Sequence, residues 1–173
     1  MKIKSFQGGY DDNLCYLIWC EHTKIAAVID PSVEPKSIFN YIKTRGLILN
    51  KILITHTHQD HIQYLGDFTK KYQKSAVYIS KETILNNKGF IEIEHNDIIA
   101  VGENLIHVLS TPGHYRDSIC YWFKDKNLIF TGDTVFVGRT GRTIGSGSDI
   151  ATLYNSIYNI ILKLPLDTMI YPG

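Results

Sequence analysis

The sequence predicts an α+β fold in which two β-sheets stack face to face between outer helices, a four-layer αββα sandwich. Many short apolar runs are rich in Ile, Val and Tyr and are bounded by Gly, Pro, Asn or Asp, as strands are. Fewer segments show the apolar spacing of helices, and every helix and sheet has an apolar face that must be covered. A chain of 173 residues is long enough for one such core. We therefore expect a single domain over residues 1–173.

The apolar runs locate the strands along the chain. Each run has the length of a strand and is bounded by residues that favour turns. We expect strands near residues 2–6, 13–19, 24–30, 51–55, 76–80, 90–94, 104–111, 118–124, 127–132 and 168–171.

Three segments carry apolar residues at helical spacing. The first begins at Pro35, because Pro is favoured in the first turn of a helix, and ends before Gly46. The second starts around Asp60, and its apolar face consists of Leu65, Phe68 and Tyr72. The third runs from about Ser148 to Lys163, with an apolar face made of Ile150, Leu153, Ile157, Ile160 and Leu164. Each face is expected to pack on a sheet.

Composition and charge limit the possible partners. A hydrophobic fraction of 44% and a charged fraction of 20% are typical of folded globular proteins. Eighteen Lys and Arg against seventeen Asp and Glu give a formal net charge of +1. That charge is too small to favour nucleic acid or an anionic membrane as the main partner. We expect a small-molecule partner; the sequence leaves the oligomeric state open.

The cysteines and the length of the apolar segments indicate the cellular compartment of the protein. Cys15, Cys20 and Cys120 are an odd number without Cys-x-x-Cys spacing, so we expect buried thiols and neither a disulfide framework nor a thiolate zinc site. The N-terminus has no apolar signal segment, and no stretch approaches the roughly 20 apolar residues that span a bilayer. A cytoplasmic protein is the default expectation.

A dense group of metal-binding side chains follows the strand at 51–55. The next six residues include His56, His58, Asp60 and His61. In an extended segment residues i and i+2 point the same way, so His56 and His58 can reach one metal ion together. If the chain then turns into a helix, Asp60 and His61 face a second, adjacent ion. Isolated histidines are more often surface or core residues, and this applies to His22, His95 and His107.

A catalytic site needs about three protein ligands and an open position, so further ligands must come from elsewhere in the chain. His114 follows a strand and a Pro-Gly turn, and Asp133 follows a strand and Gly132. Strand ends can deliver both residues to one rim of the sandwich. Imidazole and carboxylate ligands suit zinc, iron or manganese.

These motifs resemble the metallo-β-lactamase superfamily. THTHQDH at 55–61, TPGH at 111–114 and FTGD at 130–133 are similar, in order and spacing, to its metal-binding motifs. The segments at 11–19, 28–32, 111–123 and 130–143 look like the glyoxalase II (hydroxyacylglutathione hydrolase) branch, which is related to the persulfide dioxygenases. The resemblance implies the four-layer αββα metallo-β-lactamase sandwich and a metal-dependent enzyme.

The resemblance also implies how the ligands are divided between two ions. It places His56, His58 and His114 on the first metal ion and Asp60 and His61 on the second. Asp133 would bridge the two ions. The implied cofactors are two divalent metal ions, preferably Zn²⁺.

The family has a further histidine on the second ion, in a Tyr-Pro-Gly/Ala-His or Cys-Gly-His segment. Here Tyr171, Pro172 and Gly173 are the last residues of the sequence. We therefore expect the domain to be truncated at its C-terminus, immediately before that ligand; the alternative is a defective second site. The truncation would also remove the C-terminal helical region, which in glyoxalase II helps to hold glutathione.

The Gly-rich segment at 138–148 has two interpretations. One is a flexible connection, which Gly and Ser favour. The other is substrate binding, because Arg139 or Arg142 can form paired charge-assisted hydrogen bonds with a carboxylate. Glyoxalase II typically has Lys and Tyr where this chain has Arg142 and Ile144, and the Gly-Arg-Thr at 141–143 looks more like the persulfide dioxygenases.

Two mechanisms follow from these residues. The first is hydrolysis of a thioester or similar acyl bond of a small, glutathione-like thiol substrate by a metal-bound hydroxide, with Asp60 and Asp133 as catalytic residues. The second is oxidation of glutathione persulfide by a mononuclear Fe²⁺ dioxygenase, in which His56, His114 and Asp133 hold the iron. A remote alternative is a degenerate, non-catalytic fold. A nuclease would need a nucleic-acid-binding region for which the chain has no room.

Overall fold

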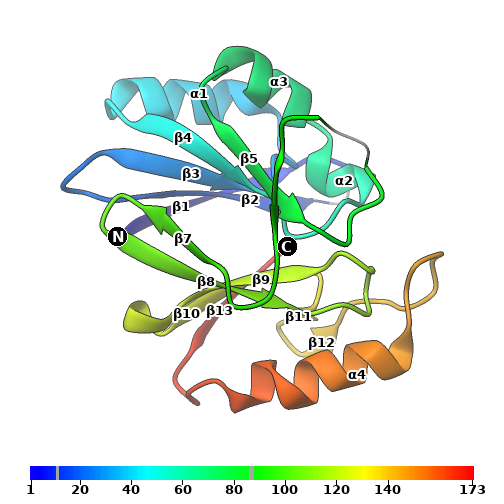
Figure 1. Cartoon of the computed structure of the whole chain (residues 1–173). Helices are drawn as coiled ribbons and strands as arrows, with labels where there is room; N and C mark the ends of the chain where they lie inside the picture. The colour runs from blue at the N-terminus through cyan, green and yellow to red at the C-terminus, as the bar shows by residue number, and fades with distance from the viewer. Residues whose placement is uncertain (11, 86–87) are drawn as a thin grey trace.

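The computed structural model describes residues 1–10, 12–85 and 88–173, and it contains two large sheets that lie face to face (Figure 1). The first sheet has the strand order β1-β2-β3-β4-β5-β6. β1 and β2 form an antiparallel hairpin, β2 pairs antiparallel with β3, and β3 to β6 are parallel. The strand bounds are β1 Lys2–Gly8, β2 Asn13–Trp19, β3 Ile25–Ile29, β4 Ile48–Leu53, β5 Ala76–Ser80 and β6 Ile91–Ile93.

The second sheet has the order β13-β10-β9-β8-β7. Its strands pair antiparallel except for β13, which runs parallel to β10. A separate two-stranded ribbon, β11 with β12, follows β10. The bounds are β7 Ile98–Val101, β8 Asn104–Ser110, β9 Ile119–Phe123, β10 Leu128–Gly132, β11 Val135–Phe136, β12 Arg139–Thr140 and β13 Met169–Pro172.

Helices cover the outer faces of both sheets, as Figure 1 shows. α1 (Pro35–Thr44) and α3 (Leu65–Lys71) lie on the first sheet and contribute Ile38, Ile42 and Phe68 to its outer core. α4 (Ile150–Asn159) and the 3-10 helix η2 (Ile161–Lys163) lie on the second sheet. Two short elements, α2 (Gln59–Ile62) and the 3-10 helix η1 (Lys124–Lys126), lie in connections. The predicted αββα sandwich is confirmed.

The core between the sheets follows from alternation along the strands. In β2, Tyr16 and Ile18 face the second sheet, whereas Cys15 and Leu17 face the helices. The three cysteines are buried, as predicted, and all are free thiols. Aromatic rings fill the middle layer, where the Phe130 ring lies 4.9 Å from that of Tyr16 in an edge-to-face arrangement.

The sequence missed some elements. β7 has only four residues and is half exposed, so its apolar run was too short to separate from a loop. β11 and β12 have two residues each and carry no pattern. The predicted second helix is divided into α2 and α3 at Tyr64, whose backbone is not helical. The third begins after Asp149, because the Asp149 side chain accepts from the backbone N–H of Thr152 at 2.7 Å and caps the helix there.

The strands deliver their carboxyl ends to one rim. β3 and β4 are parallel, and β8 and β10 run the same way because both are antiparallel to β9. The residues after these four strands include all the predicted metal ligands. Within the described residues no helix is long and apolar enough to cross a membrane.

We expect Phe130→Ala to lower the free energy of unfolding by about 3–5 kcal/mol, because Phe130 is fully buried among aromatic rings and its removal leaves a cavity. Leu105→Ala is the matched control, since Leu105 is about half exposed on β8, and it should cost less than about 1 kcal/mol. Urea unfolding with a chelator present measures both. Similar losses in the two variants would contradict this description of the core.

Candidate metal centre

The segment 55–58 is extended after β4 and carries alternating side chains. His56 and His58 point into the candidate centre, and Thr55 and Thr57 point to buried carboxylates on the other side. α2 then begins at Gln59 and turns Asp60 and His61 to another side. The predicted change from strand to helix therefore occurs within the cluster.

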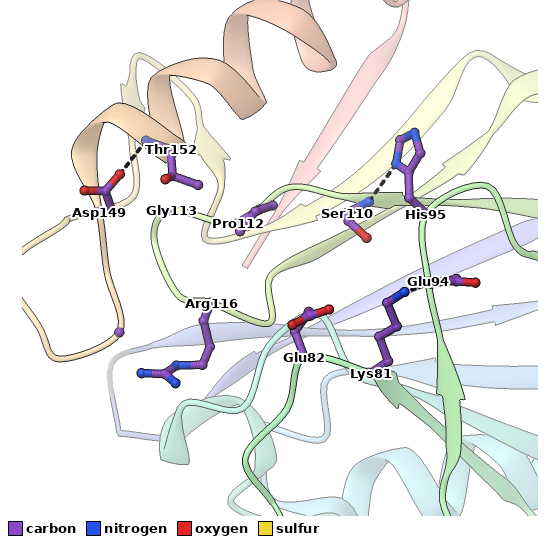
Figure 2. A pocket seen from close by; sticks show the side chains of 11 residues that line it. Lys81, Glu82, Glu94, His95, Ser110, Pro112, Gly113, Arg116, Asp149 and Thr152 are labelled. Carbon is purple, nitrogen blue, oxygen red and sulfur yellow. Dashed lines mark hydrogen bonds and ion pairs between the residues drawn. The ribbon is translucent and has the colours of Figure 1, made fainter.

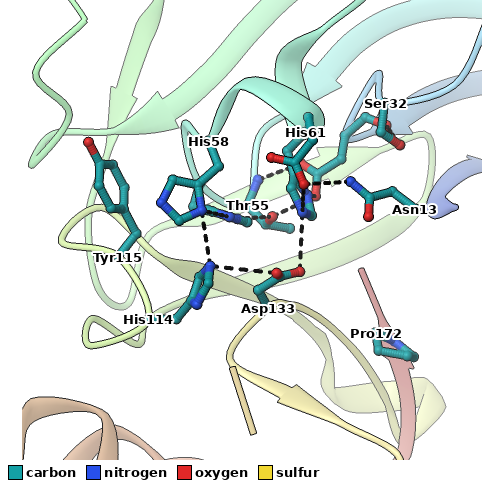
Figure 3. A network of polar contacts seen from close by, with 12 residues as sticks. Asn13, Ser32, Thr55, His58, His61, His114, Tyr115, Asp133 and Pro172 are labelled. Carbon is teal, nitrogen blue, oxygen red and sulfur yellow. Dashed lines mark hydrogen bonds and ion pairs between the residues drawn. The ribbon is translucent and has the colours of Figure 1, made fainter. Parts of the chain in front are cut away.

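Three imidazole nitrogens converge in the first half of the centre (Figure 3). His58 Nδ1 lies 3.0 Å from His56 Nε2 and 3.1 Å from His114 Nε2. Zinc–nitrogen bonds of 2.0–2.1 Å in tetrahedral geometry separate the ligand nitrogens by about 3.3 Å. The observed spacing and the three nitrogen donors therefore fit a divalent metal ion.

The second half of the centre contains a buried nitrogen without a partner. His61 Nε2 lies 3.1 Å from Asp133 Oδ1 and 3.8 Å from Asp60 Oδ2. It is fully buried and has no hydrogen-bond partner of acceptable geometry among the residues that the structure describes. Such an atom is costly unless something satisfies it, and a metal ion aligned with its lone pair would do so.

Asp133 faces both halves. Its Oδ1 lies 3.1 Å from His61 Nε2, and its Oδ2 lies 3.5 Å from His114 Nε2. The structure thus brings His56, His58 and His114 into one group, and His56, His61 and Asp133 into a second group that shares His56. Asp60 lies beside the second group, held by Asn13, whose Nδ2 donates to Asp60 Oδ2 at 2.9 Å.

Buried groups behind the centre orient the imidazoles. Asp30 is buried at the end of β3, and its carboxylate accepts from Thr55 N (2.7 Å), Thr55 Oγ1 (2.5 Å) and His61 Nδ1 (2.9 Å). The Arg142 carbonyl accepts from His114 Nδ1 at 2.8 Å. The contacts to His61 and His114 engage Nδ1 of each ring, so Nε2 is the nitrogen directed at the centre. Asp30 has a left-handed backbone (φ 49°), which Asp tolerates better than most residues do.

Burial and neighbouring charges shift the pKa values of several side chains in the centre. Burial and the neighbouring imidazoles hold the pKa of His56 well below its usual value, and they lower that of His58. Burial alone would lower the pKa of His61, but the carboxylates of Asp133 and Asp30 outweigh it and raise that pKa to about 10. Burial would raise the pKa of Asp133, but His61 outweighs it and the value is lowered. His56 and His58 are therefore expected to be neutral near pH 7, whereas His61 would have to lose a proton in order to bind a metal ion.

The centre opens into a hollow of about 730 Å³. His58, Asp60, His114, Asp133 and Gly173 form part of its lining, close to the centre. Phe136, Arg139, Thr140, Arg142 and Ile144 also line it. The Arg139 guanidinium stacks over the Phe136 ring at 4.8 Å. Binding of a substrate carboxylate by Arg139 or Arg142 stays a prediction.

Two glycines approach the centre closely. A Cβ on Gly173 would lie 2.6 Å from Asp133 Oδ1 and 2.8 Å from His61 Cε1, so this residue borders the second half. Gly141 is buried, and a Cβ there would lie 2.9 Å from the His114 ring and would overlap the Asp133 carbonyl oxygen. At Gly141 the Gly-rich segment is therefore packed against the centre.

The other histidines lie outside the centre. His22 pairs with Glu103, and the His107 ring lies 5.7 Å from that of Trp122. His95 Nδ1 accepts from the backbone N–H of Ser110 and borders a separate hollow of about 480 Å³ (Figure 2). Neither group of metal-binding atoms found in the described residues lies in that hollow.

The chain matches the family model of the metallo-beta-lactamase superfamily over residues 8–173. It belongs to this superfamily. The resemblance to this superfamily is therefore confirmed, and five of the six predicted ligands, all but Asp60, lie in groups that could hold a metal ion. Their individual roles stay predictions.

Similar proteins include hydrolases. The chain is 35% identical to the probable hydroxyacylglutathione hydrolase glo2 of Schizosaccharomyces pombe, over 95% of this chain and 64% of that protein. It is 32% identical to the probable polyketide biosynthesis zinc-dependent hydrolase PksB of Bacillus subtilis, over 93% of this chain and 72% of PksB. The crystal structure of ETHE1 from Myxococcus xanthus superposes with a TM-score of 0.91 at 31% identity and covers all of this chain and 75% of ETHE1. The chain thus spans less than two thirds of the S. pombe relative.

Sequence reasoning missed the groups behind the ligands. Asp30, Asn13 and Asp117 each contact the ligand segments, although none is a predicted ligand. The position of Asp30 at the end of a strand parallel to β4 was the one available signal. The partners of Asn13 and Asp117 are 47 and 60 residues away, so no local pattern marks them.

We expect Gly141→Ala to weaken zinc binding by roughly 10–100-fold, the usual effect of disturbing the groups that support metal ligands. The added methyl group must displace either the backbone of Asp133 or the His114 ring. Gly66→Ala is the control, because a Cβ at this position in α3 meets no atom within 4 Å. Competition with a chromophoric chelator measures the affinity, and an unchanged affinity in Gly141→Ala would contradict the packing described above.

Proposed function

We propose that the chain is a metal-dependent hydrolase that cleaves a thioester or similar acyl bond of a small, glutathione-like thiol substrate. The observation that carries the proposal is the placement of Asp133 between two adjacent half-sites, with one carboxylate oxygen directed at each. The hydroxyacylglutathione hydrolase and zinc-dependent hydrolase names of the relatives support it.

The proposed division of the ligands is the one that the family resemblance implies; the first group in the structure matches it, and the second contains His56 and not Asp60. His56, His58 and His114 would hold one zinc ion and Asp60 and His61 the other, with Asp133 between them. Two bound zinc ions lower the pKa of a water molecule toward neutrality and polarise a carbonyl group. Within the chain, the Asn13 amide holds one Asp60 oxygen, so the other can orient the attacking water.

The hollow suits a substrate with an acidic tail. Arg139 and Arg142 line it together with the proposed ligands His58, His114 and Asp133. A guanidinium binds a carboxylate through two parallel hydrogen bonds, which would place the acyl bond of a tethered substrate over the half-sites.

A second candidate function uses fewer residues. His56, His114 and Asp133 form a two-histidine, one-carboxylate set, which is the arrangement that holds Fe²⁺ with open positions. The Gly-Arg-Thr at 141–143 also resembles the persulfide dioxygenases. This candidate is a mononuclear persulfide dioxygenase acting on glutathione persulfide, and it does not require the second half-site.

Metal identity and reaction separate the two candidates. We expect the purified protein to contain zinc and to cleave a hydroxyacylglutathione thioester without consuming oxygen. Elemental analysis, thioester cleavage and an oxygen electrode with glutathione persulfide provide the readouts. Iron with oxygen uptake would instead establish the dioxygenase, and a folded protein with neither activity would support the non-catalytic alternative.

His58→Ala should abolish thioester cleavage and lower the bound zinc, because His58 Nδ1 is the nitrogen that lies next to both other imidazoles of the first half-site. His107→Ala is the control, since His107 lies on β8 against Trp122 and away from the centre. Full turnover with normal metal content in His58→Ala would contradict the assignment of His58 as a metal ligand. Retained iron with oxygen uptake would favour the dioxygenase, whose proposed ligands do not include His58.

A further inference from the structure

The segment Thr55-His56-Thr57-His58 presents two faces, and only one of them is explained by the candidate metal centre. The histidines face the centre, and each threonine faces a buried aspartate that accepts from both its hydroxyl and its backbone N–H. Thr55 uses Asp30 in this way. Thr57 uses Asp117, with Thr57 Oγ1 2.6 Å from Oδ2 and Thr57 N 3.3 Å from Oδ1.

Asp117 is a buried acidic residue in the turn between β8 and β9. Its side chain is 1% exposed, and among the described residues its only hydrogen-bond donors are the two groups of Thr57. A buried carboxyl group is destabilising unless such bonds satisfy it. The position of Asp117 is therefore tied to the position of Thr57.

The two residues belong to different ligand-bearing segments. Thr57 lies between His56 and His58, and Asp117 lies three residues after His114 in the turn between β8 and β9. The backbone N–H of Ile119 donates to the Thr55 carbonyl at 2.7 Å and joins the same two segments. The Thr57–Asp117 pair adds a side-chain contact between the two segments.

We propose that the Thr57–Asp117 pair is a positioning element that sets the distance between His56 and His58 on one segment and His114 on the other. The inference rests on the proposed metal ligands. It does not depend on whether the reaction is hydrolysis or oxidation.

Asp30 and Asp117 differ in their hydrogen-bond donors, and the difference restricts the positioning role of Asp117 to the first half-site. Asp30 accepts from His61 as well as from Thr55, so it reaches both halves of the centre. Among the described residues, the Asp117 carboxylate accepts hydrogen bonds from Thr57 alone and from no group of the second half. Loss of the Thr57–Asp117 bond should therefore affect the first half-site.

The test compares Thr57→Val, which has the same shape without the hydroxyl, with Thr57→Ser, which keeps the hydroxyl. Thr69→Val is the matched control, because within the described part of the chain the Thr69 hydroxyl bonds only to backbone carbonyls of its own helix, α3. Zn²⁺ alone is titrated in competition with a chromophoric chelator, and the absorption spectrum of the Co²⁺-loaded protein reports ligand geometry.

We expect Thr57→Val to bind Zn²⁺ roughly 10–100-fold more weakly and to change the Co²⁺ spectrum. Thr57→Ser should restore both to the wild-type values, and Thr69→Val should leave both unchanged. Wild-type affinity and spectrum in Thr57→Val would overturn the proposal, as would an equal loss in Thr57→Ser. If the wild-type chain binds neither Zn²⁺ nor Co²⁺, both the metal centre and the positioning role are rejected. Wild-type behaviour of Thr57→Val, or an equal loss in Thr57→Ser, rejects the positioning role alone.

Thr57→Val leaves the Asp117 carboxyl group with one donor and could prevent folding. The double variant Thr57→Val/Asp117→Asn is then used in place of Thr57→Val. The Asn amide has the same shape as the Asp117 carboxylate and carries no charge to be left unpaired. Near-UV circular dichroism establishes that the variant is folded. Weaker Zn²⁺ binding with an altered Co²⁺ spectrum in the folded double variant supports the proposal, and wild-type behaviour contradicts it.

Discussion

The Asp30 carboxylate accepts three hydrogen bonds. These bonds hold together the segments of the first sheet that carry candidate metal ligands. Asp30 follows β3, Thr55 follows β4 and His61 lies in α2, and all three meet at this one buried group. Burial of a carboxylate is unfavourable in itself, and three donors at 2.5–2.9 Å offset that cost. His61 is fixed by the same contacts with its Nε2 directed at Asp133.

The centre also depends on the separation of the two sheets. His56, His58, Asp60 and His61 come from the first sheet, whereas His114 and Asp133 come from the second. The core between the sheets therefore sets the distance between the two groups of ligands. Gly132 contributes to it, because a Cβ at this left-handed position would lie 2.5 Å from Thr55 Oγ1. A metal ion that binds both groups would link the sheets and stabilise the fold.

Local pattern was sufficient for most of the fold and for the ligands, and insufficient where partners are distant in sequence. Except for β7, the strands of both sheets follow from apolar runs, and α1 follows from Pro35 and Gly46. No run of residues marks the β11–β12 ribbon or the break between α2 and α3, where the backbone N–H of Tyr64 donates to the Pro31 carbonyl. The extent of the domain, its predicted truncation and its cytoplasmic location stay predictions.

The sequence by itself determined the chemistry available to this protein, because imidazole and carboxylate side chains at strand ends are dictated by residue type and spacing. It determined that His56 and His58 point the same way, since alternation is a property of any extended segment. The family resemblance already implied that Asp133 lies between the half-sites; only the tertiary structure gave its distances to them and placed Asp30 and Asp117 behind them. These placements depend on contacts between segments 25 to 72 residues apart, and such contacts are set by the packing of the two sheets.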